Sequence, residues 1–185
     1  MQRITALNPD TATGKTKDLF NKVQQKLGLV PNMMRTMGTS PAVLNAYLSL
    51  SGALAEGKIG AALGEKIALL VAELNECDYC AAAHHFIGEK LVKIDKASIE
   101  SSRQGKSENS RIQAALTFAK TLVEKQGRFT NADVDNVYLA GFTEGEIGEI
   151  VGHVALNIFT NYFNNTARTV VDFPKVELLS GVSHT

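Results

Sequence analysis

The chain contains two cysteines, Cys77 and Cys80, which stand three residues apart and are followed by His84. A thiolate is the reactive form of cysteine, and a neighbouring histidine can take the thiol proton. If the chain is helical from Cys77 onward, a rotation of about 100° per residue places the three side chains within about 60° of one another. Two thiols one turn apart can close into a disulfide, and a helix N-terminus favours a thiolate. The spacing therefore predicts a dithiol redox site.

Two helical segments must position these residues. The sequence EKIALLVAELN, which follows Gly64, has few polar positions and predicts a helix buried on most sides, with Glu65 in its first turn. Asn75 interrupts this run and is a plausible N-cap for a second helix from Cys77 to about Val92. His84 lies four residues after Cys80, so its imidazole can face that sulfur directly or through one water.

The rest of the chain also reads as helical, with apolar residues at helical spacing and no alternation typical of a half-buried strand. Helices are predicted over 18–27, 32–37, 41–56, 95–102, 110–124, 131–139 and 144–166. Ser40 before Pro41 is a helix entry, and Thr143 with Glu146 forms a capping box. We predict an all-α, single-domain helical bundle over residues 1–185, with irregular segments at 1–15 and 170–185.

The amino-acid composition argues against some classes of binding partner. Lys+Arg and Asp+Glu number 19 each, so the chain has no excess positive charge for nucleic acid or an anionic membrane. No apolar run approaches the roughly 18 residues that span a bilayer, and the first residues do not resemble a signal peptide. We expect a cytoplasmic protein, in which a C-x-x-C pair indicates redox or metal chemistry more often than a structural disulfide.

The four residues Glu65, Cys77, Cys80 and His84 follow the spacing E-x(11)-C-x(2)-C-x(3)-H. This pattern resembles the alkylhydroperoxidase D-like branch of the carboxymuconolactone decarboxylase superfamily. The segments LVPNMMRTMGTSPAVLNAYLSLSGAL and NIFTNYFNNTARTVVDFP extend the resemblance over most of the chain, toward the uncharacterised peroxidase-related members.

The resemblance implies an all-helical subunit that assembles into a homo-oligomer, a trimer or a hexamer. It also implies roles: Cys80 attacks the peroxide, Cys77 resolves the product as a disulfide, and His84 with Glu65 relays protons. In well-studied alkylhydroperoxidases a second histidine directly precedes the second cysteine, where this chain has Tyr79. The relay at that position therefore differs in this protein.

Several alternatives remain open for individual residues. The two cysteines could be buried packing residues, or they could bind zinc with His84 or His85, although a structural zinc site usually needs a second ligand pair. His85 points about 100° away from His84 and is interpreted as a surface or core histidine.

Two further groups of residues are interpreted as packing residues that could also reach the site. His153 and Asn157, four residues apart on the last long helix, favour a core or subunit-contact role but could line the same pocket. Met33, Met34 and Met37 indicate a flexible apolar patch that could flank a hydroperoxide pocket.

The leading functional hypothesis is a thiol-dependent hydroperoxide reductase that needs no bound cofactor and is reset by a thioredoxin-like or lipoyl-bearing dithiol. A redox-responsive, non-catalytic protein would use the same residues and turn over only once. A lactone decarboxylase of the same superfamily is a third hypothesis, but that chemistry has no need of a dithiol. The sequence does not name the hydroperoxide or the reductant.

Overall fold

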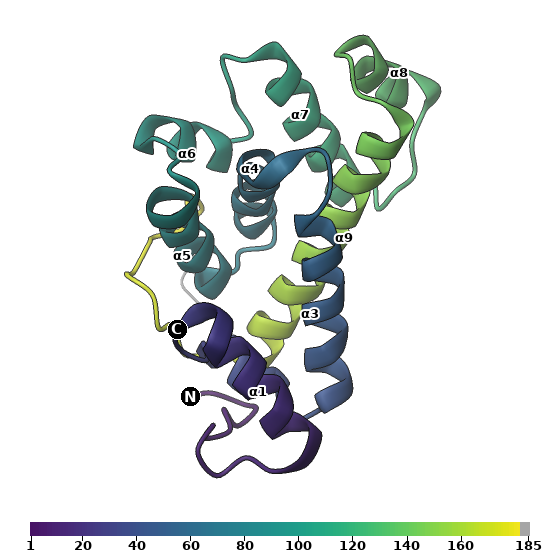
Figure 1. Ribbon diagram of the computed structural model, residues 1–185. Helices are drawn as coiled ribbons and strands as arrows, with labels where there is room; N and C mark the ends of the chain where they lie inside the picture. Colours follow the sequence, from purple (N-terminus) through teal and green to yellow (C-terminus); the bar gives the residue numbers. More distant parts are fainter. Residues whose placement is uncertain (182–185) are drawn as a thin grey trace.

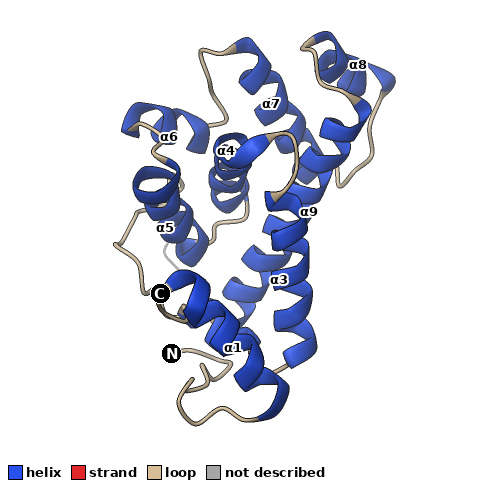
Figure 2. Ribbon diagram, viewed as in Figure 1, coloured by secondary structure: helices blue, strands red, loops and turns tan. Residues whose placement is uncertain are grey.

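The computed structural model describes residues 1–181, and within this range every regular element is a helix (Figure 2). The elements, in chain order, are α1 (Gly14–Leu27), α2 (Asn32–Met37), α3 (Pro41–Ala55), α4 (Gly60–Leu74), α5 (Asp78–Phe86), the π-helix η1 (Ile87–Val92), α6 (Lys96–Arg103), α7 (Ser110–Glu124), α8 (Asn131–Leu139) and α9 (Glu144–Ala167). The predicted all-α class is confirmed. No helix among residues 1–181 has both the length and the apolar character needed to cross a bilayer.

Helix α4 is the central element, because it packs against α5, α6, α7 and α9 (Figure 1). Its sequence is apolar on nearly every face, and the run from Lys66 to Ala72 is buried without a break. Burial on all sides requires such a composition, as the sequence predicts. Because α5 follows α4 after a short turn, the cysteines begin next to the most deeply buried helix of the protein.

Helix α9 is the longest element and runs beside both α3 and α4 (Figure 1). Its predicted capping box is confirmed: Thr143 accepts from the Glu146 N–H, and the Glu146 carboxylate accepts from the Thr143 N–H at 2.9 Å. The two reciprocal bonds satisfy donors that a helix start otherwise leaves unpaired.

The predicted boundaries agree with the structure for α2, α7 and α8 and differ elsewhere. Helix α1 begins at Gly14 and α4 at Gly60, both four residues before the predicted starts. The predicted helix from Cys77 to Val92 is correct in extent but changes from α to π hydrogen bonding at Ile87. Propensity and periodicity do not distinguish these two bonding patterns, so the change could not be predicted.

After α9 the chain is irregular and crosses back over the N-terminal part of the molecule. The Asp172 carboxylate accepts a hydrogen bond from the Asn32 N–H at 2.7 Å, and the Arg3 N–H donates to the Ala167 carbonyl at 2.7 Å. These bonds join the segment after α9 to the start of α2, and the N-terminal residues to the end of α9. The prediction of an irregular tail agrees with residues 170–181, and its last four residues lie outside the described range.

Candidate functional site

The turn between α4 and α5 fixes where the cysteines lie. Glu76 adopts a left-handed conformation, with φ of 50°. The Glu76 N–H donates to the Glu73 carbonyl, and the Cys77 N–H donates to the Ala72 carbonyl at 2.9 Å. This pair of bonds is a Schellman motif, which ends α4 and reverses the chain. Asn75 is the C-cap of α4, so its predicted role as the N-cap of the next helix is wrong.

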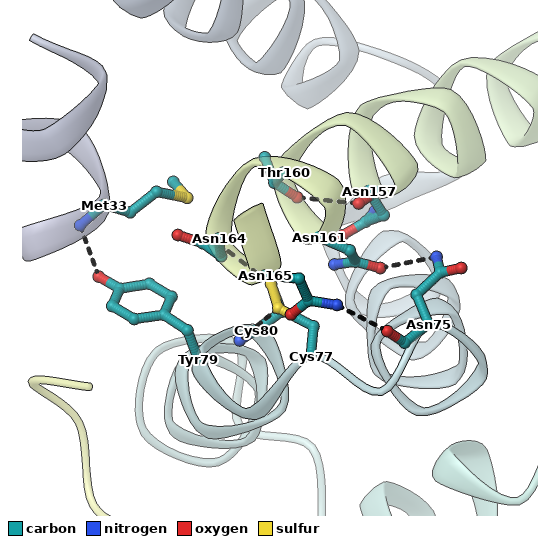
Figure 3. Close-up of a disulfide and its surroundings, with 10 residues drawn as sticks. All are labelled: Met33, Asn75, Cys77, Tyr79, Cys80, Asn157, Thr160, Asn161, Asn164 and Asn165. Carbon is teal, nitrogen blue, oxygen red and sulfur yellow. Dashed lines mark hydrogen bonds between the residues drawn. A yellow bond between two sulfur atoms is a disulfide. The ribbon is translucent and has the colours of Figure 1, made fainter. Parts of the chain in front are cut away.

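Cys77 is itself the N-cap of α5. Its Sγ accepts a hydrogen bond from the Cys80 N–H at 3.3 Å, which is the position that a serine or aspartate oxygen takes in an ordinary cap (Figure 3). Cys77 and Cys80 form a disulfide with their Cα atoms 5.2 Å apart. The sequence prediction that this pair can close into a disulfide is confirmed.

The two sulfurs differ in access. Cys77 has no exposed surface, and Cys80 is 2% exposed but lines a cavity of about 570 Å³. A second cavity of about 420 Å³ lies near Tyr79 and the chain ends, and neither cysteine lines it. A small molecule therefore reaches the disulfide from the larger cavity, at Cys80.

The Glu65 carboxylate reaches His84 across the junction of α4 and α5. His84 Nδ1 lies 2.8 Å from Glu65 Oε2, and both side chains are mostly buried. An ionised carboxylate only accepts hydrogen bonds, so Nδ1 carries the proton and Nε2 of a neutral ring is left as a base. The structure thus brings together Glu65 and His84 as a pair, and both line the cavity that contains Cys80.

The walls of this cavity are mainly apolar. Met33, Met34, Leu156 and Phe173 are among its lining residues, so the predicted methionine patch contributes two of its three members. Met37 instead lies in the core with no exposed surface. Such a lining suits a substrate with an apolar body and one reactive group.

Helix α9 supplies polar groups to the same cavity. His153 and Asn157, interpreted from sequence mainly as core residues, both line it. Burial lowers the pKa of His153, partly opposed by Glu65, so its ring is neutral near pH 7. His153 Nε2 is buried and has no hydrogen-bond partner.

Tyr47, on α3, also lines the cavity, and burial raises its pKa to about 12, which keeps the phenol protonated.

Tyr79, which replaces the second histidine of the alkylhydroperoxidases, is occupied elsewhere. Its hydroxyl accepts a hydrogen bond from the Met33 N–H at 3.1 Å (Figure 3). Its ring meets the Phe173 ring edge-on, with centroids 5.7 Å apart. Burial raises the pKa of Tyr79, and a hydrogen bond to Asp172 acts in the same direction. The side chain joins α5 to α2 and the tail, and it is a poor proton carrier at neutral pH.

Sequence reasoning missed Asn164. Its Nδ2 donates to Cys80 Sγ over 3.3 Å, and the side chain is buried (Figure 3). A signal was present, because Asn157, Asn161 and Asn164 recur at helical spacing along one face of α9. Buried amides at such positions indicate specific hydrogen bonds, but the sequence does not say with which partner.

His85 and the metal alternative can be placed as well. His85 faces away from the cavity, and its Nε2 lies 3.4 Å from Glu100 Oε1. Among residues 1–181, no group of three or more histidine, cysteine, aspartate or glutamate side chains is arranged to hold a metal ion.

Comparisons with known proteins agree with the predicted resemblance. No family model and no curated protein matches the chain. Solved structures do match. An uncharacterized peroxidase-related protein from Silicibacter sp. TM1040 has 25% identity and a TM-score of 0.77, covering 90% of this chain and 91% of its own. A peroxidase-related protein from Ralstonia eutropha JMP134, described as an alkylhydroperoxidase AhpD core, has 23% identity and a TM-score of 0.82, covering 92% of each chain.

The debrominase Bmp8 is similar to the same extent, with 22% identity, a TM-score of 0.77 and coverage of 91% of each chain. A cysteine-to-alanine variant of Bmp8 was solved in complex with 2,3,4-tribromopyrrole and matches equally well. Structures with this fold therefore include proteins named for different activities. These neighbours establish that the chain has the fold of the alkylhydroperoxidase AhpD core, as found in the two peroxidase-related proteins, and this fold is consistent with the resemblance that the sequence motif carries.

Proposed function

We propose that the protein is a thiol-dependent hydroperoxide reductase in which Cys80 attacks and Cys77 resolves. The observation that supports this most directly is the difference between the two sulfurs, since Cys80 lines the cavity and Cys77 is covered. In the first step the Cys80 thiolate attacks the outer oxygen of a hydroperoxide, the O–O bond breaks, and the alkoxide takes a proton and leaves as an alcohol. Cys80 becomes a sulfenic acid.

In the second step the Cys77 thiolate attacks the Cys80 sulfur and displaces hydroxide, which leaves as water after protonation. The balance is one hydroperoxide and two thiols converted to one alcohol, one water and one disulfide. His84, with its Nδ1 held by Glu65, accepts the Cys80 proton at Nε2 and returns it to the leaving oxygen. The disulfide sulfur has no proton to give, so this transfer takes place in the reduced protein, directly or through one water.

An external dithiol, thioredoxin-like or lipoyl-bearing, resets the enzyme. It attacks Cys80, the sulfur that lines the cavity, and expels the Cys77 thiolate. The Cys80 N–H that caps Cys77 stabilises this leaving group. The second thiol of the reductant then attacks the mixed disulfide and releases reduced Cys80.

A single-turnover experiment tests this reaction. The fully reduced protein is mixed with a slight excess of an organic hydroperoxide, quenched, and assayed for intact mass and free thiols. We expect loss of two thiols and two mass units within seconds. Cys77→Ser should stop at a sulfenic acid that a dimedone probe traps, and Cys80→Ser should not react. Wild-type thiols that persist for hours would refute the proposal, and oxidation that a dithiol cannot reverse would favour the non-catalytic redox protein.

The debrominase neighbour and the apolar cavity support a second candidate, reductive dehalogenation of a halogenated aromatic ring. Here the Cys80 thiolate takes the halogen, the ring carbon takes a proton, and Cys77 displaces halide to form the disulfide. The balance is one aryl halide and two thiols converted to one arene, one hydrogen halide and one disulfide. Incubating reduced protein with a brominated pyrrole and measuring bromide release tests it, and absence of bromide at full thiol retention rejects it.

The homo-oligomer that the family resemblance implies is also a proposal. Helix α3 is apolar overall, yet Leu44 is its only fully buried residue, and Leu50 is exposed. An apolar helix with so little buried surface is typical of a subunit interface. We expect a molar mass in solution above that of the 19.9 kDa chain, measured by light scattering at micromolar concentration. A monomer under those conditions would contradict this expectation.

A further inference from the structure

Asn164 is positioned to act on the sulfur chemistry, although it belongs to neither the cysteine motif nor the Glu65–His84 pair. It comes from α9, and its Nδ2 lies 3.3 Å from Cys80 Sγ (Figure 3). The side chain is 3% exposed and borders the cavity that contains Cys80. A disulfide sulfur has no proton to donate, so the amide N–H group rather than the amide oxygen faces it.

The surrounding hydrogen bonds indicate that Asn164 is not needed to dock α9. Asn161 Oδ1 accepts from Asn75 Nδ2 at 3.0 Å, and Asn165 Nδ2 donates to the Asn75 carbonyl at 2.8 Å (Figure 3). These two bonds already join α9 to the turn that precedes the cysteines. Asn164 Oδ1, in contrast, is buried and has no hydrogen-bond partner. A buried acceptor without a partner destabilises the fold, so packing does not explain why an amide is present here.

The same amide has a clear effect once the disulfide is reduced. Cys80 is almost completely buried, and burial disfavours a thiolate. A hydrogen bond to an ionised acceptor is stronger than one to a neutral acceptor, so an N–H donor at 3.3 Å favours the thiolate over the thiol. The two sulfurs then have separate donors: the Cys80 N–H serves Cys77, and the Asn164 amide serves Cys80.

We propose that Asn164 is a catalytic residue, whose side-chain amide donates to the Cys80 thiolate and selectively increases the ionised fraction of that cysteine. The proposal rests on the proposed function in assigning attack to Cys80. It predicts that removal of the amide lowers the fraction of Cys80 that is ionised at a given pH but does not lower the stability of the fold.

The test measures alkylation by iodoacetamide as a function of pH in variants with a single cysteine. In the Cys77→Ser background, adding Asn164→Leu should raise the pH midpoint of Cys80 alkylation by about one unit. Adding Asn164→Asp, which is nearly the same size and is the second variant if leucine does not fold, should raise it further because two negative charges then meet. Adding Thr166→Leu is the control at an exposed side chain of the same helix, and it should leave the midpoint unchanged.

The mirror experiment uses the Cys80→Ser background, where the midpoint of Cys77 alkylation should not respond to Asn164→Leu. Thermal unfolding of Asn164→Leu should occur at or above the wild-type temperature. Equal midpoints with and without Asn164, or an equal shift at Cys77, would overturn the proposal. Alkylation involves no peroxide, so a shifted midpoint in a protein that does not react with hydroperoxide would refute the proposed function and leave the role of Asn164 standing.

Discussion

At the scale of single residues, the spacing of the motif carried most of the predictive information. Glu65 and His84 are nineteen positions apart, and their contact at 2.8 Å agrees with the proximity that the motif implies. The contact between Asn164 and Cys80 was not predicted, because it joins residues 84 positions apart and has no motif of its own. The structure also explains why tyrosine is compatible with position 79, since its hydroxyl is bound by the Met33 N–H.

His84 and His85 offer a matched pair for testing the proton relay. His84 lines the cavity and pairs with Glu65, whereas His85 pairs with Glu100 outside it. We expect His84→Gln to slow the loss of Cys80 thiol with hydroperoxide by about a hundredfold near pH 7, because the general base is lost. His85→Gln should react at the wild-type rate. The second-order rate constants come from stopped-flow mixing, and equal rates for the two variants would argue against a relay through His84.

At the scale of helices, a strong local capping signal could be predicted from the sequence, whereas an unusual turn and the crossing of two helices could not. The predicted capping box of α9 is present, because Thr143 and Glu146 are a strong local signal. The turn at Glu76 was misread, because a left-handed residue at this position is usually glycine and the asparagine before it resembled an N-cap. The position of His153 was also hidden, because it depends on how α4 and α9 cross.

Gly64 marks this crossing. A Cβ atom at Gly64 would lie 2.8 Å from His153 Cε1. We expect Gly64→Ala to lower the free energy of unfolding by about 1–3 kcal/mol, because the helices must move apart or the imidazole must shift. Gly52→Ala is the control within α3, where a Cβ would meet nothing within 4 Å. It should raise the free energy of unfolding by about 0.5–1 kcal/mol, since alanine favours a helix. Chemical denaturation measures both, and two stabilised variants would show that the crossing tolerates a methyl group.

The start of α9 should make stability depend on acid pH. Hydrogen bonds from Thr143 and Arg111 lower the pKa of Glu146 from 4.5 to about 2 in the folded protein. Because the folded pKa is the lower one, this contribution is complete above pH 4.5 and is lost as the pH falls toward 2. We expect wild type to be more stable than Glu146→Gln at pH 7, and the two to converge near pH 2. Denaturation at several pH values measures this, with Glu144→Gln as the exposed control.

At the scale of the whole molecule, the all-α class was predictable because helical periodicity recurs along nearly the entire chain. The way the tail closes over the helices was not. Arg103, only 6% exposed, contacts Glu73 at 2.6 Å, and Glu73 also accepts from the Leu179 N–H at 2.9 Å. Nothing in the sequence pairs an arginine of α6 with a glutamate of α4 and an irregular segment. Such contacts depend on how α4, α6 and the irregular tail pack together. The periodicity of any one of these segments carries no information about that packing.

The covered position of Cys77 has a kinetic consequence. If only Cys80 can be reached from outside, oxidant and reductant must occupy the same space in turn, and the protein cannot hold both. Steady-state turnover should follow a ping-pong scheme, with parallel double-reciprocal lines and inhibition by excess dithiol, which occupies the cavity of the reduced form. Initial rates measured over a grid of hydroperoxide and dithiol concentrations test this, and intersecting lines would require a second entrance. The burial of one sulfur atom would then set the order in which electrons enter and leave the protein.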